Sequence, residues 1–251
     1  MRRSMVVANW KMYVSRASAR VLLREIVDAV SEPPSCEVGV CAPYVYIPDC
    51  AEIVQGTCVL LGAQNLSDHK DGPYTGEISA AMLSEFGCRL VLVGHAERRY
   101  LYGENNLSVA ARYLKAIEYG IAPILCVGET LEQREQGRTF QAIAEQLDTV
   151  ISIAGIDSFT RAVVGYEPVW AIGSGQTASA EQAQEVHAFI RSQIASHSPR
   201  IAESLRILYG GSVKPKSAPE LFAMPDIDGG LIGVAALNKQ SFLEICNAVK
   251  V

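Results

Sequence analysis

The sequence lacks the features of a nucleic-acid-binding protein or a membrane protein. Its 251 residues carry 22 Lys and Arg against 27 Asp and Glu, a formal net charge of −5, and after Arg2-Arg3 no basic run is longer than Arg98-Arg99. Proteins that bind nucleic acid usually show a basic patch instead. No apolar run approaches the roughly 20 residues of a transmembrane helix, and the run that starts at Met5 is too short for a signal-peptide core. We therefore expect no nucleic-acid or membrane partner, and only local positive charge for an anionic substrate.

The cysteines also lack a pattern, and no linker, repeat or low-complexity tract is visible. Seven cysteines are scattered through apolar surroundings, and none belongs to a C-x-x-C pair. An odd number without such spacing argues against a disulfide framework and against a zinc site. We expect buried free thiols, a reducing cytoplasmic compartment and no structural metal.

Short apolar runs recur at fairly even intervals and predict eight strands. The runs cover residues 5–9, 37–42, 58–63, 89–94, 121–127, 161–166, 205–209 and 228–233. Several are apolar without alternation, such as the run from Leu90 to Val93, which is typical of parallel strands covered on both faces.

Helical patterns lie between these runs. Apolar residues share one helix face in three stretches, namely Leu22, Leu23, Ile26, Val27 and Val30, then Ile143, Leu147, Val150 and Ile151, then Val186, Ile190 and Ile194. Alternating strands and helices leave two architectures, an open doubly wound sheet or a closed barrel. Eight strands, with no change in composition along the chain that would mark a second domain, favour the closed barrel. We therefore predict a single α/β domain over residues 1–251, a (β/α)8 barrel with a closed parallel sheet.

In such a barrel all strands point the same way, so residues just past different strands converge at one end. The first strand is followed by Asn9 and Lys11, the fourth by His95, the sixth by Glu167, the seventh by Gly210-Gly211-Ser212 and the eighth by Gly233-Val234. Pro168 forbids continuation of the sixth strand, which places Glu167 at its carboxyl end. A carboxylate base, a cation, an imidazole and backbone amide donors are therefore expected to meet there.

Each candidate also has a purely structural interpretation. Lys11 alone could be a surface lysine whose stem covers apolar surface, His95 a hydrogen-bonded structural histidine, and Gly210-Gly211 a tight turn. Their positions directly after buried strands favour function. The remaining histidines do not end an apolar strand and are predicted to be structural, namely His69, His187 and His197.

Two loops exceed the usual connection of about 4 to 6 residues. They cover residues 65–79 and 168–178. The second contains Gly173-Ser174-Gly175-Gln176-Thr177-Ala178, which fits a variant of the dinucleotide-binding G-x-G-x-x-G pattern. It begins several residues after its strand, and no acidic strand end follows about 20 residues later, so we reject a dinucleotide site. The loop is better interpreted as a lid that follows Glu167.

Five segments carry a resemblance that covers the whole chain. They are Asn9-Trp10-Lys11-Met12, Gly94-His95-Ala96-Glu97-Arg98-Arg99, Leu125-Cys126-Val127-Gly128-Glu129, Tyr166-Glu167-Pro168-Val169-Trp170-Ala171-Ile172-Gly173 and Tyr209-Gly210-Gly211-Ser212-Val213. In these motifs, in their order and near their spacings, the chain resembles the triosephosphate isomerase family. The resemblance implies a TIM barrel enzyme of glycolysis and gluconeogenesis.

The resemblance implies interconversion of dihydroxyacetone phosphate and D-glyceraldehyde 3-phosphate through an enediolate, without a metal or an organic cofactor. Glu167 would move a proton between two carbons, and a neutral His95 would shuttle protons between the two oxygens. Lys11 would stabilise the developing oxyanion, Asn9 would donate a hydrogen bond nearby, and Glu97 would support or relay protons. A short helix starting at Ala96 would disfavour imidazolium at His95 through its positive N-terminal end.

The resemblance also implies a phosphate site and a homodimer. Backbone amides of Gly173, Ser212, Gly233 and Val234 would hold the phosphate. The 65–79 loop would dock into a second subunit, with Tyr74 and Thr75 at the interface and Thr75 close to the partner subunit's active site.

The chain departs from the family after the eighth strand. The family usually has Gly-Gly there and a serine two residues later, whereas this chain has Gly233-Val234-Ala235-Ala236. Val234 keeps its N–H, but a β-branched residue cannot easily adopt a positive φ. We therefore expect the phosphate loop to be the part whose geometry and affinity differ from the family.

Two other functions compete with isomerisation. One is another phosphate-binding barrel enzyme, such as an aldolase or a different aldose-ketose isomerase, which would lack the lid. The other is a catalytically inert phosphosugar-binding barrel or interaction scaffold. The presence of Lys11, His95 and Glu167 together argues against an inert protein.

Overall fold

Eight parallel strands close into a barrel in the computed structural model, which describes residues 2–30, 36–171 and 177–249. Each strand pairs with the next, and β8 pairs with β1. The strands are β1 Met5–Asn9, β2 Glu37–Ala42, β3 Leu60–Ala63, β4 Leu90–Val93, β5 Ala122–Val127, β6 Val163–Tyr166, β7 Arg206–Tyr209 and β8 Gly229–Ile232. The predicted (β/α)8 barrel is confirmed, and each predicted run contains one strand.

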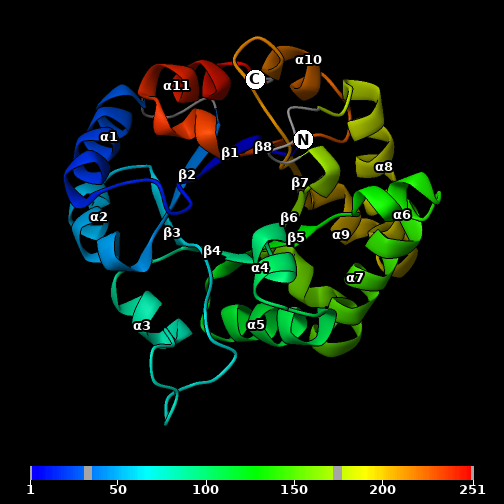
Figure 1. Cartoon of the computed structure of the whole chain (residues 1–251), viewed down its shortest axis with the longest axis horizontal. Coiled ribbons are helices and arrows are strands. Elements are labelled where there is room, and N and C mark those ends of the chain that lie inside the picture. The colour runs from blue at the N-terminus through cyan, green and yellow to red at the C-terminus, as the bar shows by residue number, and fades with distance from the viewer. Residues whose placement is uncertain (1, 31–35, 172–176, 250–251) are drawn as a thin grey trace.

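Helices surround the barrel on all sides (Figure 1). The α-helices are α1 Arg16–Ala29, α2 Ile47–Val54, α3 Ala80–Glu85, α4 Ala96–Leu101, α5 Asn106–Glu118, α6 Leu131–Glu135, α7 Thr139–Ala154, α8 Ala180–His197, α9 Pro199–Ser204, α10 Ala218–Phe222 and α11 Lys239–Asn247. Short 3-10 helices are η1 Tyr44–Tyr46, η2 Ile156–Arg161, η3 Val169–Ala171 and η4 Val234–Leu237. The three predicted apolar faces fall on α1, α7 and α8. Ser15 and Ser179 form capping boxes that fix where α1 and α8 begin.

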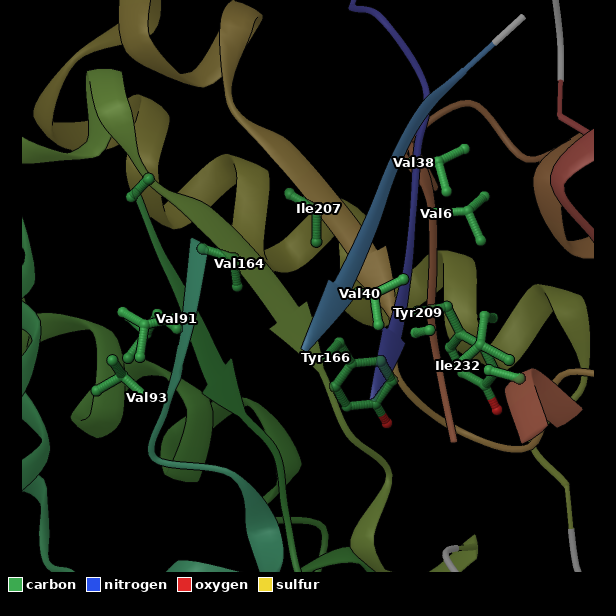
Figure 2. Packing of buried hydrophobic residues seen from close by; sticks show 14 of the residues in the cluster. Val6, Val38, Val40, Val91, Val93, Val164, Tyr166, Ile207, Tyr209 and Ile232 are labelled. Carbon is green, nitrogen blue, oxygen red and sulfur yellow. The ribbon is translucent and has the colours of Figure 1, made fainter. Parts of the chain in front are cut away.

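The core has two layers because side chains along a strand alternate between its faces. In β1, Met5 and Val7 point into the barrel, where they join residues that come only from strands. Val6 and Ala8 belong to a larger outer layer that also contains helix residues. Figure 2 shows part of this outer layer, including Val164 on β6 and Ile207 on β7. Burial on both faces explains why the strand sequences are continuously apolar.

The cysteines agree with the expectation of buried free thiols. All seven are unpaired, and all except Cys58 are buried. Burial raises the pKa of Cys50 and of Cys88 to about 12, which disfavours the reactive thiolate. In the part of the chain that the structure describes, no helix is long and apolar enough to span a membrane.

One connection extends beyond the ring of helices. The chain between β3 and α3 forms a projecting loop, coloured cyan in Figure 1. Residues 69–77 are exposed along this loop. The rings of His69 and Tyr74 stack with centroids 3.9 Å apart, which gives the tip a defined shape.

Candidate active site

A cavity of about 740 Å³ lies at the carboxyl end of the barrel. Its lining brings together the predicted residues that follow strands β1, β4, β6, β7 and β8, namely Asn9, Lys11, His95, Glu97, Glu167, Ser212, Gly233 and Val234. Gly173 lies outside the described residues. The expected convergence of strand ends therefore places a base, a cation and an imidazole around one space.

His95 and Glu167 form the buried centre of this cavity. His95 is the N-cap of α4, and its Nδ1 accepts a hydrogen bond from the Glu97 N–H at 3.2 Å. Its Nε2 lies 3.0 Å from Oε1 of Glu167, while Oε2 of Glu167 accepts a hydrogen bond from the Ala96 N–H at 2.8 Å. Both side chains are buried. The contacts hold the carboxylate and the imidazole in fixed orientations.

Lys11 has an unusual backbone conformation. Its φ is +50°, and no other non-glycine residue in the described ranges has a positive φ. This conformation costs roughly 1–2 kcal/mol for a residue with a Cβ, so neighbouring contacts must hold it. The Lys11 N–H donates to Oδ1 of Asn9 at 3.0 Å, and Nε2 of Gln64 donates to the Lys11 carbonyl at 2.9 Å.

These contacts direct both side chains towards the cavity. The Lys11 ammonium pairs with Oε1 of Glu97 at 2.7 Å, and Oε2 of Glu97 lies 3.7 Å from Nδ1 of His95. Asn9 uses its carbonyl oxygen for Lys11, so its amide NH2 is left as the donor. Gln64 is not among the residues predicted from the sequence, although its position one residue after β3 follows the same rule that identified the other candidates.

Two glycines allow the backbone to approach Glu167 closely, a role that the sequence did not predict for either of them; Gly210 was predicted only as part of an anion-binding turn. A Cβ at Gly128 would lie 1.8 Å from the carbonyl oxygen of Glu167, and a Cβ at Gly210 would lie 2.9 Å from its Cγ. Any side chain at Gly128 would therefore displace the catalytic candidate. The sequence does contain an indication of this role, because both glycines directly follow the strands that flank β6, namely β5 and β7.

Arg99 ties the neighbouring strand ends together. Its guanidinium donates to the carbonyl oxygens of Gly94 at 2.8 Å and Cys126 at 3.1 Å, and to Oδ1 of Asn106 at 2.8 Å. Burial lowers the pKa of Arg99, while nearby acidic groups, including Glu167, act in the opposite direction. Arg99 therefore supports the walls behind His95 and Glu167 without lining the cavity.

The segment that follows Glu167 is held by a buried carboxylate. Oε1 of Glu129 accepts hydrogen bonds from Nε1 of Trp170 at 2.9 Å and from the Tyr166 hydroxyl at 3.1 Å, and it pairs with Arg134 at 3.1 Å. Burial, followed by the charge of Glu129, raises the pKa of Tyr166, which keeps the hydroxyl a donor. The start of the lid candidate is thus anchored through η3.

The phosphate loop does not show the strain that Val234 suggested. Val234 begins η4, and it has no positive φ. A β-branched residue is tolerated in this helical backbone, so the conflict expected from its sequence does not arise. Among the described residues, no acceptor is found for the backbone N–H of Ser212 or Val234. Both residues line the cavity, so these amides are free to bind an anion.

Metal ligands are not grouped in this site. Over residues 2–30, 36–171 and 177–249, no three His, Cys, Asp or Glu side chains are arranged to hold a metal ion. The expectation that the chemistry needs no metal or organic cofactor stays a prediction.

Comparison with known proteins identifies the family of the chain. The family model described as triosephosphate isomerase matches residues 4–249. The protein named triosephosphate isomerase from Methylococcus capsulatus is 58% identical over 251 residues, covering 100% of each chain. Those from Nitrosococcus oceani and Nitrosomonas eutropha are 53% and 51% identical over 99% of each chain. The chain belongs to the triosephosphate isomerase family.

Proposed function

We propose that this chain is an aldose-ketose isomerase that interconverts dihydroxyacetone phosphate and D-glyceraldehyde 3-phosphate. The observation that carries the proposal is the contact between Nε2 of His95 and Oε1 of Glu167 at 3.0 Å, inside a cavity that also contains Lys11. An adjacent base and hydrogen-bond donor are what proton transfer between neighbouring carbons requires. We also propose that residues 1–251 work as one catalytic domain.

In the proposed reaction Glu167 takes a proton from the carbon next to the substrate carbonyl and returns it to the neighbouring carbon. Between these steps the substrate is an enediolate, whose negative charge builds up on oxygen. Lys11 and the amide of Asn9 stabilise that charge. Low exposure of Glu167 keeps water away from the base and the intermediate.

His95 acts as a neutral imidazole. A ring nitrogen that accepts a hydrogen bond carries no proton, and Nδ1 accepts from the Glu97 N–H. The proton is then on Nε2, where it can be donated to a substrate oxygen and recovered from the other one. The Glu97 carboxylate lies 3.7 Å from Nδ1 and is itself paired with Lys11. Glu97 therefore serves as a supporting group that positions both partners.

The phosphate is held by backbone amides of Ser212, Gly233 and Val234, together with Gly173. The unused N–H groups of Ser212 and Val234 support this assignment. Lid closure over the phosphate would separate the enediolate from water. If the lid did not close, the enediolate could instead lose its phosphate group.

The functional unit is proposed to be a cytoplasmic homodimer. The projecting loop carries Tyr74, and large apolar side chains are also exposed in the segments that follow β1, β2, β3 and β4, namely Met12, Val45, Met82, Phe86 and Tyr102. A monomer would leave this apolar surface in water. Thr75 lies in the exposed stretch of the loop and would approach the partner subunit's active site.

A coupled assay on purified protein tests the activity. Conversion of D-glyceraldehyde 3-phosphate into dihydroxyacetone phosphate is measured beside Glu167→Gln, a variant of equal size without the base. Turnover that disappears in the variant supports the proposal and excludes a contaminating enzyme. Triose phosphate binding without turnover would instead identify an inert phosphosugar-binding barrel.

A further inference from the structure

We propose that the opposite, amino end of the barrel carries a second ligand site, which binds a small organic polyanion. A pocket of about 280 Å³ lies there, separate from the active-site cavity. Its lining includes Glu37, Leu60, Leu90, Ala122 and Arg206, each at the first position of its strand. The inference does not depend on the proposed isomerase activity.

The floor of this pocket is apolar. Leu90 belongs to the layer inside the barrel, and Leu60 and Ala122 pack against that layer. These residues close the barrel interior, so a ligand would rest on the closed end rather than enter it. An apolar floor favours an organic molecule with a carbon skeleton over a hydrated inorganic ion.

Three guanidinium groups surround that floor. Arg89, Arg161 and Arg206 line the pocket together with a single carboxylate, Glu37. The local formal charge is therefore three positive groups minus one negative group, or +2, within a chain whose net charge is −5. The active-site cavity has no such excess, because Lys11 and Lys214 are balanced there by Glu97 and Glu167.

The three arginines differ in how they are used. Arg206 pairs with Glu37, and Arg161 donates one N–H to the carbonyl oxygen of Ile117 at 3.2 Å. The Arg89 guanidinium has no hydrogen bond or ion pair with any residue in the described ranges. Guanidinium groups bind phosphate and carboxylate through paired N–H donors. Arg89 and the remaining donors of Arg161 are thus available to an anion.

The positive surface continues beyond the pocket. A second hollow shares Glu37 and Arg206 with it and is also lined by Arg2, Arg3 and Arg200, with Glu203 as the only further acidic residue. The pocket itself is smaller than the roughly 300–1,000 Å³ of sites for drug-sized ligands. Its occupant is therefore a short-chain compound with two or more phosphate or carboxylate groups.

Titration with citrate, a short-chain tricarboxylate, followed by amide NMR of the full chain, tests the site. The amides of Leu90, Ala122 and Arg206 report on the amino end, and those of Ser212 and Val234 report on the active site, so the two sites are read separately. We expect saturable shifts at the amino-end amides. Pyrophosphate and inorganic phosphate are titrated in parallel to distinguish a polycarboxylate, a polyphosphate and a single phosphate group as the preferred chemistry.

Two charge reversals distinguish a built site from general electrostatics. Arg89→Glu should weaken citrate binding at the amino end about 10-fold or more. Arg24→Glu changes the net charge equally on the exposed face of α1, outside the pocket, and should change the affinity less than about twofold. If Arg89→Glu does not fold, Arg89→Met removes the charge and keeps the aliphatic stem.

Equal weakening by Arg89→Glu and Arg24→Glu would reduce the effect to general charge and overturn the proposal. Shifts that do not saturate, or that occur only at Ser212 and Val234, would also overturn it. Isomerase turnover is measured on each variant, and it should stay unchanged, because Arg89 lies at the other end of the barrel from Glu167.

Discussion

At the amino end of the barrel, Arg2, Arg191 and Arg206 are paired with carboxylates, whereas at the carboxyl end two backbone amides of the cavity have no acceptor among the described residues. Asp228, just before β8, accepts from Arg2 at 2.6 Å, from Arg191 at 2.8 Å and from the Ile207 N–H at 2.8 Å. The two amides at the carboxyl end are the N–H groups of Ser212 and Val234, after β7 and β8, for which residues 2–30, 36–171 and 177–249 supply no acceptor. Satisfied groups stabilise a fold, and unsatisfied groups are available to a ligand.

Backbone strain is another feature of the carboxyl end of the barrel. Lys11, at positive φ, lies at the carboxyl end, where Gln64 and Asn9 hold it. Strained conformations persist where surrounding contacts enforce them, and they are often found at functional sites. The comparison indicates that the amino end contributes stability and the carboxyl end contributes chemistry. Arg89 departs from this pattern, because its guanidinium has no ion pair or hydrogen bond with any described residue, and it motivates a second ligand site.

The strongest test of this division is Asp228→Ala. The substitution removes the carboxylate that pairs with Arg2, one of the two carboxylates that pair with Arg191, and the acceptor of the buried Ile207 N–H, so unfolding should become easier by about 3–5 kcal/mol. Turnover per folded molecule should stay unchanged. Denaturant titration measures stability, and active-site titration normalises turnover. A large fall in turnover per folded molecule would show that the two ends are not independent.

The converse test is Glu167→Asp at the carboxyl end. The shorter side chain withdraws the carboxylate by roughly 1 Å, which should lower kcat by about 10²-fold or more, with a smaller change in binding. Thermal unfolding should remain near that of the unaltered protein. Near-normal kcat would remove Glu167 as the base and with it the assignment of chemistry to this side chain.

Charged substitutions in the projecting loop test whether one chain alone forms a complete active site at the carboxyl end of the barrel. Tyr74→Asp with Thr75→Asp should produce monomers, because the interface would have to bury two carboxylates. Activity should fall about tenfold or more if neighbouring loops depend on the partner for their positions. Sedimentation gives the oligomeric state. A dimer that persists would reject Tyr74 and Thr75 as interface residues.

The pH dependence of stability offers a smaller effect, centred on the fully buried His187. Burial lowers its pKa to about 3, so the folded protein keeps this imidazole neutral. The unfolded chain binds a proton near pH 6.5, and folding therefore loses stability as pH falls below that value. Between pH 6.5 and 5.5 the loss should be about 1 kcal/mol.

Denaturant titration of His187→Gln at both pH values isolates this contribution. Glutamine can still donate to the carbonyl oxygen of Asp226, which lies 3.2 Å from Nδ1 of His187, but it does not titrate. The loss of stability between the two pH values should become smaller in the variant. The same pH dependence in both proteins would assign the effect to other groups.

Strand positions were predictable because barrel strands are buried on both faces and appear as uninterrupted apolar runs. Asn9, His95 and Glu167 followed from the rule that the carboxyl ends of parallel strands converge. Gln64 and Arg99 were not recognised as support, because their roles depend on carbonyl oxygens of residues far along the chain. The pairing of Asp228 with Arg2, 226 residues away, is equally invisible in the sequence.

The smallest expected effect concerns Val234, where the chain departs from its family. Sequence alone made this residue suspect, but η4 gives it a backbone that tolerates a β-branched side chain. Among the described residues its N–H has no acceptor, and its side chain is exposed at the cavity.

Val234→Gly should therefore change KM for triose phosphate less than about threefold, because the phosphate contact comes from the backbone. Steady-state kinetics beside Leu237→Ala, a substitution in the same 3-10 helix away from the cavity lining, separates a phosphate contact from a general effect on η4. A tenfold fall in KM for Val234→Gly alone would show that the valine weakens phosphate binding, and that the difference between the two barrel ends is sensitive to one side chain.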